Sequence, residues 1–173
     1  LGGFLALASE VAEGETGGFD EAILRALREP GDLANPIGPL WVELMMKDIT
    51  SLGGITILTI LTLAASGYAL VKGRVRMALF IIASVAGGTA LGHSLKLVFA
   101  RPRPELVSHG VDVFTMSFPS GHAMLSAVTY LTLGTLLARL DMTITGRAYI
   151  MALAAFLTVS VGVSRVYLGV HYP

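Results

Sequence analysis

Four long uncharged hydrophobic runs constrain the fold of this chain more than any other feature of its sequence. A transmembrane helix needs about 17–25 predominantly apolar residues to cross about 30 Å of hydrocarbon, and each run has such a length. Buried helices of a soluble protein are the alternative, but four such runs in one chain of 173 residues favour a membrane protein. The runs are Gly53–Val71, Met77–Leu95, Gly121–Ala138 and Ala148–Ser164.

The overall composition supports the same conclusion. Only 14 % of the residues are charged, whereas soluble domains carry about 25 %. The net charge is zero, so no overall field would attract nucleic acid, and we expect no such partner. The chain has no cysteine, which excludes disulfides and thiolate metal sites. We therefore expect one all-α, multi-pass transmembrane helix bundle over residues 1–173.

The turns between the runs predict the orientation of the bundle. Short loops rich in Lys and Arg stay on the cytoplasmic side of a membrane. Two helical hairpins should therefore turn inside, leaving residues 100–120 and the segment after Ser164 on the extracytoplasmic face. We expect a protein of the cell (inner) membrane. The basic residues of the two turns are Lys72, Arg74 and Arg76 in the first, and Arg139 and Arg147 in the second.

Residues 1–52 are less apolar, and we expect them to form an N-terminal interfacial region beside a helical core of residues 53–173. Between Asp20 as a candidate cap and Pro30 as a stop, apolar residues recur every four positions. Glu21 and Arg25 have the spacing of an ion pair on one helix face. This segment predicts an amphipathic helix on the membrane surface, or a small soluble helix packed on the bundle. A second short helix should begin near Trp41.

The first polar cluster follows the second run. Lys96 should lie in the last helical turn, because the prolines after Arg101 and Arg103 force the chain into an extended conformation. Arg103 then lies on a stiff segment that could fold back over Lys96. Taken alone, Lys96 also fits a lysine that extends its ammonium group to the interface. Gly88 and Gly92 in the same run have the spacing that lets helices approach closely in lipid.

The second cluster opens the third run with the sequence Pro-Ser-Gly-His. Ser120 is a candidate N-cap, and the amides after it have no acceptor within the helix. Such an N-terminus attracts anions. Gly121 would let a ligand approach the backbone, and His122 would lie beside that ligand. An ordinary helix cap is the alternative for this motif taken alone.

The third cluster ends the fourth run with Arg165, followed six residues later by His171. On a continuous helix, a spacing of six residues would direct the two side chains to different faces. A bend at Gly169 could bring them together. Pro173 suits the first position of another helix, so we expect the full protein to continue.

The predicted orientation brings all three clusters to one face of the membrane. Together they supply three cations, a helix N-terminus and two histidines, and ionisable residues at membrane depth mark function by default. Three cations with free amides suit a tetrahedral phosphate dianion. Two histidines beside one anion suggest a nucleophile and a proton donor. Carboxylate clusters are missing near these motifs in the sequence, so we expect neither a bound metal nor another cofactor.

The three motifs resemble the signature of the type-2 phosphatidic acid phosphatase superfamily. They are Lys-x6-Arg-Pro from Lys96, Pro-Ser-Gly-His from Pro119 and Ser-Arg-x5-His from Ser164, and the resemblance covers about residues 40–173. It implies a six-helix bundle, which this chain would hold in truncated form. It also implies that His171 forms a phosphohistidine, that His122 is the general acid, and that Lys96, Arg103, Arg165, Ser120 and Gly121 hold the phosphoryl oxygens. An aspartate that orients the nucleophile would lie beyond Pro173.

We therefore expect a metal-independent membrane phosphatase that hydrolyses a lipid phosphate or pyrophosphate at the extracytoplasmic face. Phosphatidylglycerophosphate and undecaprenyl pyrophosphate are both candidate substrates. The same residues in a haloperoxidase would hold vanadate, but haloperoxidases of this superfamily are soluble. A non-enzymatic anion transporter would spread its polar residues toward the membrane midplane, whereas here they gather at one end. His93 and His109 match no motif position. For His93 a packing role and a substrate contact are the alternatives, and we expect packing; we expect His109 to be solvated.

Overall fold

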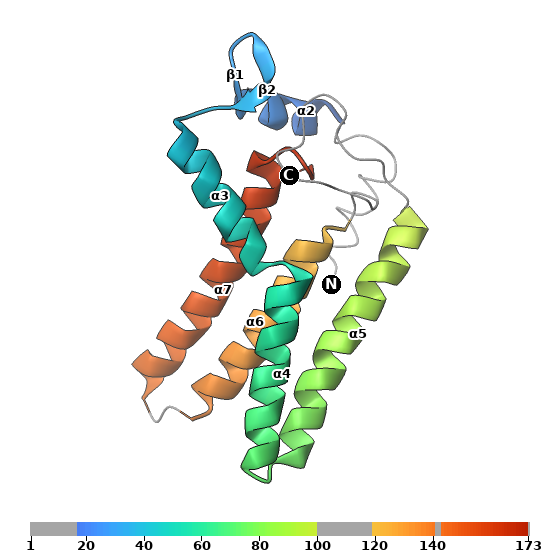
Figure 1. Ribbon diagram of the computed structural model, residues 1–173, viewed down its shortest axis with the longest axis vertical. Helices are drawn as coiled ribbons and strands as arrows, with labels where there is room; N and C mark the ends of the chain where they lie inside the picture. Colours follow the sequence, from blue (N-terminus) through green and yellow to red (C-terminus); the bar gives the residue numbers. More distant parts are fainter. Residues whose placement is uncertain (1–16, 100–118, 141–142, 173) are drawn as a thin grey trace.

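The computed structural model describes residues 17–99, 119–140 and 143–172. Within these ranges the chain is helical except for one short hairpin, as Figure 1 shows. The elements are α2 (Gly17–Ala26), β1 (Arg28–Glu29), β2 (Asp32–Pro36), α3 (Leu40–Leu52), α4 (Ile55–Val71), α5 (Val75–Phe99), α6 (Gly121–Ala138) and α7 (Ile144–Tyr167).

Each of the four predicted hydrophobic runs forms a helix. The run Gly121–Ala138 coincides with α6, and the runs in α5 and α7 extend by a few residues at both ends. These extensions carry basic residues, which can reach the interface while their stems stay on the apolar helix. The helices α5, α6 and α7 are each long and apolar enough to cross a membrane. A fourth candidate span is made by α3 and α4 together, with a bend of 44° between them.

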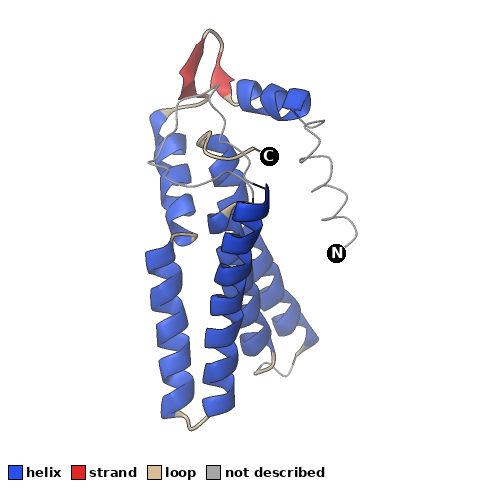
Figure 2. Ribbon diagram, turned by 90° about the vertical axis from the view of Figure 1, so that its right-hand side faces the viewer, coloured by secondary structure: helices blue, strands red, loops and turns tan. Residues whose placement is uncertain are grey.

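The two predicted helical hairpins are present. The turn between α4 and α5 and the turn between α6 and α7 lie at the same end of the bundle (Figure 1). Gly73 makes the first turn possible, because its φ of 68° is unfavourable for residues with a side chain. The opposite end carries α2 and the β-hairpin, which projects past the helix ends in Figure 2. Both basic turns therefore share one end.

The outer surface of the helices is strongly apolar. Many large hydrophobic side chains point away from the bundle, among them Leu63, Leu97 and Phe156. A smaller set, including Leu58, Tyr130 and Ala154, packs between the helices. Such a surface would be unfavourable in water, but lipid tails solvate it well.

Glycines set the closest contacts between the spanning helices. A methyl group on Gly88 of α5 would lie 2.8 Å from Cγ2 of Val128 on α6. A methyl group on Gly92, one turn later, would lie 3.2 Å from Sδ of Met124. The Gly88 and Gly92 pair therefore faces α6, and the predicted close approach of two helices at this spacing is confirmed.

The N-terminal segment differs from the prediction in two respects. The ion pair between Glu21 and Arg25 is present at 3.8 Å. Asp20, however, lies within the first turn of α2 and is not its cap. Pro30 also does not end the helix, because the chain has already left it and pairs β1 with β2 around Gly31 (φ 90°). A Pro-Gly pair is a strong turn signal, and here it makes a hairpin.

The contact at Gly88 predicts a difference between two neighbouring substitutions. We expect Gly88→Ala to lower the apparent midpoint of thermal unfolding in detergent, because the stiff Val128 must move to admit the methyl group. Gly87→Ala is the matched control, since no atom lies within 4 Å of the added carbon. Its unfolding midpoint should equal or exceed that of the wild type. Equal midpoints for the two variants would contradict the close packing of α5 on α6.

Candidate active site

The described residues of the three polar motifs lie at helix ends on one side of the bundle. The C-terminal end of α5, the N-terminal start of α6 and the C-terminal end of α7 all lie on the side that carries α2 (Figure 1). This is the end opposite the two basic turns. The arrangement follows from the alternating direction of the helices, and it places Lys96, His122 and Arg165 in end turns on the same side of the bundle.

Lys96 lies against the first turn of α6. It is in the last turn of α5, as predicted. A Cβ atom on Gly121 would lie 3.4 Å from Nζ of Lys96 and 3.7 Å from its Cε. The ammonium group is therefore beside a helix N-terminus, where free amides and the helix dipole already favour an anion. Because Gly121 has no side chain, the Lys96 ammonium group can approach the backbone closely at the start of α6.

Ser120 caps α6, which confirms the predicted N-cap. Its Oγ accepts a hydrogen bond from the amide of Ala123 at 3.3 Å. The cap fixes where the helix begins and so fixes the position of His122 in the first turn. The His122 side chain is neither fully buried nor fully exposed.

Arg165 is buried in the last turn of α7, with only 4 % of its surface exposed. Its Nη1 donates a hydrogen bond to Oγ1 of Thr50 on α3 at 3.3 Å. A buried guanidinium group is costly unless its donors are satisfied. Thr50 therefore holds Nη1 of the Arg165 guanidinium group in place.

A tight turn after α7 reverses the chain between Arg165 and His171. Gly169 adopts a φ of 73°, and its amide bonds the carbonyl of Val166 at 3.0 Å. The next amide, of Val170, bonds the carbonyl of Arg165 at 3.2 Å. This pair of bonds is a Schellman motif, which reverses the chain at a helix end. The predicted bend at Gly169 is confirmed, and His171 beyond it is buried, with 4 % exposure.

The bend between α3 and α4 contacts both α6 and α7. A Cβ atom on Gly53 would lie 3.4 Å from Cβ of His122 and only 2.5 Å from Cγ1 of Val161 on α7. Three residues earlier, Thr50 bonds Arg165. His122 and Arg165 therefore lie on either side of one short stretch of backbone. The sequence alone gave no indication of this stretch as part of the site.

Comparison with known proteins identifies the family. Residues 77–173 match the model of the PAP2 superfamily. The chain belongs to the PAP2 superfamily. It is 29 % identical to phosphatidylglycerophosphatase B of Bacillus subtilis (strain 168), over 98 % of this chain and 80 % of the relative. A crystal structure of a transmembrane PAP2 type phosphatidylglycerolphosphate phosphatase from Bacillus subtilis matches with a TM-score of 0.84, covering 98 % of this chain and 81 % of that chain.

These findings confirm the predicted family, the all-α multi-pass membrane fold and the enzyme class. The protein is a membrane PAP2 lipid phosphatase, and its substrate is a lipid phosphate. The structure brings Lys96 together with the start of α6, and it joins Arg165 to α3. Arg103 and His109 lie outside the described residues, so their predicted roles stay predictions. His93 is exposed on α5, which does not agree with the expected packing role.

The arrangement suits the binding of a tetrahedral oxyanion. Lys96 and Arg165 offer charge-assisted donors, and the first turn of α6 offers backbone amides. Within residues 17–99, 119–140 and 143–172, no group of three or more His, Asp or Glu side chains has the arrangement of a metal site.

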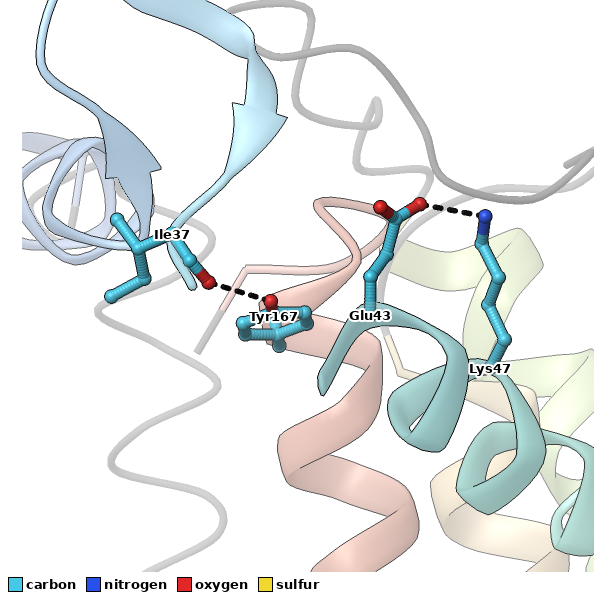
Figure 3. A network of polar contacts seen from close by, with 4 residues as sticks. All are labelled: Ile37, Glu43, Lys47 and Tyr167. Atoms are coloured by element: carbon cyan, nitrogen blue, oxygen red, sulfur yellow. Dashed lines mark hydrogen bonds and ion pairs between the residues drawn. The ribbon is translucent and has the colours of Figure 1, made fainter. Parts of the chain in front are cut away.

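A second buried arginine stabilises the turn that carries His171. Nη1 of Arg28 donates to the carbonyl of Tyr167 at 2.9 Å, and the Tyr167 hydroxyl donates to the carbonyl of Ile37 at 2.7 Å. Figure 3 shows the second bond beside the ion pair of Glu43 with Lys47, whose Nζ and Oε1 are 2.7 Å apart. Burial lowers the pKa of Arg28 from its ordinary value, while Tyr167 and Glu43 act in the opposite direction.

The Arg28 hydrogen bonds were not predictable from sequence, because Arg28 and Tyr167 are 139 positions apart. They tie the N-terminal hairpin to the last turn of α7, whose carbonyls have no partner within the helix. Leu168 and Val170 add an apolar contact with Leu27 on the same side. The N-terminal segment thus supports the backbone on which His171 lies.

We expect Arg28→Met to lower the apparent midpoint of thermal unfolding, because it leaves the buried carbonyl of Tyr167 without its donor. Such a loss costs about 1–3 kcal/mol. Arg25→Met is the matched control, since the Arg25 side chain is 52 % exposed and its ion pair at 3.8 Å adds little. Thermal unfolding of both variants in detergent checks this, and an equal shift would mean that Arg28 does not support α7.

Proposed function

We propose that this PAP2 enzyme is a phosphatidylglycerophosphate phosphatase whose site faces the extracytoplasmic side of the membrane. The similarity to phosphatidylglycerophosphatase B over nearly the whole chain supports the substrate. The orientation is supported by the basic turns, since Lys- and Arg-rich loops stay cytoplasmic and lie opposite the polar end. A lipid phosphate carries its headgroup at the level of the helix ends, with its tails along the apolar helix faces.

One observation carries the proposal more than any other: the ammonium group of Lys96 lies against the Ser120–Gly121 start of α6. A cation and a helix N-terminus each favour a bound anion, and here the two lie side by side. Arg165 at the end of α7 supplies a fork that matches two phosphoryl oxygens. Arg103 would add the third cation, in agreement with the family motif.

The reaction would proceed by double displacement. An imidazole nitrogen of His171 attacks phosphorus, and the bond from phosphorus to the glycerol oxygen breaks. His122 gives its proton to that oxygen, which leaves as phosphatidylglycerol. Water then attacks the phosphohistidine with His122 as the base, releasing inorganic phosphate and restoring both histidines. Lys96, Arg103 and Arg165 stabilise the charge on the equatorial oxygens without a metal ion.

A phosphate-release assay in detergent, across a panel of lipid phosphates, tests the substrate. We expect phosphatidylglycerophosphate to give the highest kcat/KM, ahead of phosphatidic acid and undecaprenyl pyrophosphate, and we expect the rate to persist in excess EDTA. Faster hydrolysis of another lipid would reassign the substrate. Loss of the rate on chelation would contradict the metal-independent mechanism.

The two histidines should respond differently to the leaving group. His171→Ala should reduce turnover by several orders of magnitude on every substrate, because the nucleophile is lost. His122→Ala should lose about 10²–10⁴-fold on the lipid, whose alkoxide needs a proton. On p-nitrophenyl phosphate it should lose much less, because nitrophenolate leaves without one. Steady-state rates of both variants check this, with His109→Ala as the control. Equal losses of the His122 variant on both substrates would exclude it as the general acid.

A further inference from the structure

A side chain of α6 forms a hydrogen bond with the bend between α3 and α4. The amides of Gly53 and Gly54 bond the carbonyls of Thr50 and Ser51, at 3.0 Å and 2.9 Å, so the helix closes tightly there. Leu52 is the last residue of α3, and its carbonyl is one of those that have no donor within the helix. The hydroxyl of Tyr130 on α6 donates to it at 2.7 Å. This bond ties the bend to α6.

Only glycine fits at the centre of the bend. A methyl group on Gly53 would lie 2.5 Å from Cγ1 of Val161, which is closer than real side chains approach, and 3.3 Å from the carbonyl oxygen of His122. The backbone of the bend therefore presses on α6 and on α7 at once. It lies against both of the helices that carry His122 and Arg165.

Thr50 projects from this bend onto Arg165. Both side chains are buried, with 5 % and 4 % exposure. The Thr50 hydroxyl accepts a hydrogen bond from Nη1 of Arg165 at 3.3 Å. A hydroxyl in an apolar helix can bond the carbonyl of its own preceding turn, as Thr62 does with Leu58 at 2.7 Å. Thr50 instead bonds a cation on another helix, 115 positions away.

We propose that Thr50 is a positioning residue for Arg165. In this proposal the bend, which depends on Gly53 and on the hydrogen bond from Tyr130, holds Thr50 beside Arg165. This inference rests on the proposed function, in which Arg165 binds the phosphoryl oxygens. An arginine fork binds two oxygens only when its plane is correctly oriented. With Nη1 of Arg165 held by Thr50, the plane of the guanidinium group is oriented before charge develops during the reaction.

The test compares Thr50→Val, which keeps the shape and removes the hydroxyl, with Thr50→Ser, which keeps the hydroxyl. We expect Thr50→Val to lower kcat on the lipid about five- to twenty-fold, with KM changed less than twofold, because the interaction matters most in the transition state. The affinity for orthovanadate, which mimics five-coordinate phosphorus, should fall by a similar factor. Thr50→Ser should stay within about twofold of the wild type.

Thr62→Val is the matched control, since it removes a buried hydroxyl from the same bent span without touching the site. It should keep the wild-type kcat and orthovanadate affinity. A second comparison uses Arg165→Lys, with and without Thr50→Val. If Thr50 acts through Arg165, the double variant should be no slower than Arg165→Lys alone.

Three results would overturn the inference: a wild-type kcat for Thr50→Val, a loss for Thr50→Ser as large as that for Thr50→Val, or fully multiplicative losses in the double variant. Failure of the proposed function has a different signature, since the wild type would then hydrolyse no lipid phosphate in the panel. In that case calorimetric titration with orthovanadate decides. Weaker binding by Thr50→Val but not by Thr50→Ser or Thr62→Val would support the inference, and unchanged or undetectable binding would reject it.

Discussion

Lipid around the helices restricts charged groups to the ends of this bundle. A charge in the hydrocarbon core is costly, and the outward faces of α4 to α7 are accordingly lined with large apolar side chains such as Leu63 and Phe156. The site therefore has to be assembled where helices end, from Lys96 closing α5, Ser120 opening α6 and Arg165 closing α7. A lipid phosphate has the complementary layout, with its charge at the interface and its tails in hydrocarbon.

Close helix packing then determines whether these ends meet. Gly88 and Gly92 bring α5 against α6, so that Lys96, at the end of α5, reaches Gly121 at the start of α6. The bend at Gly53 lies against both α6 and α7, and hydrogen bonds of Tyr130 and Thr50 join it to them. Arg28 and Tyr167 hold the last turn of α7 from the N-terminal side. Small residues make the contacts, and a few buried hydrogen bonds fix their geometry.

Local patterns in the sequence were enough to predict much of this structure. Long apolar runs predicted the helices, Ser120 predicted the cap of α6, and Gly169 predicted the turn before His171. Each of these features depends on neighbouring residues. Long-range partners were out of reach. Thr50 looks like any threonine in an apolar helix until α7 is placed against it, 115 positions later. The hairpin of β1 and β2 was missed because its strands are too short and polar to show alternation.

An experimental structure of the protein in lipid nanodiscs with bound orthovanadate tests the convergence of the three motifs most directly. The account predicts vanadate at the first turn of α6, within hydrogen-bond distance of Nζ of Lys96 and the guanidinium group of Arg165. A ring nitrogen of His171 should point at the vanadium atom, which takes the place of phosphorus. Vanadate bound elsewhere, or His171 directed away from the oxyanion beside Lys96, would contradict it.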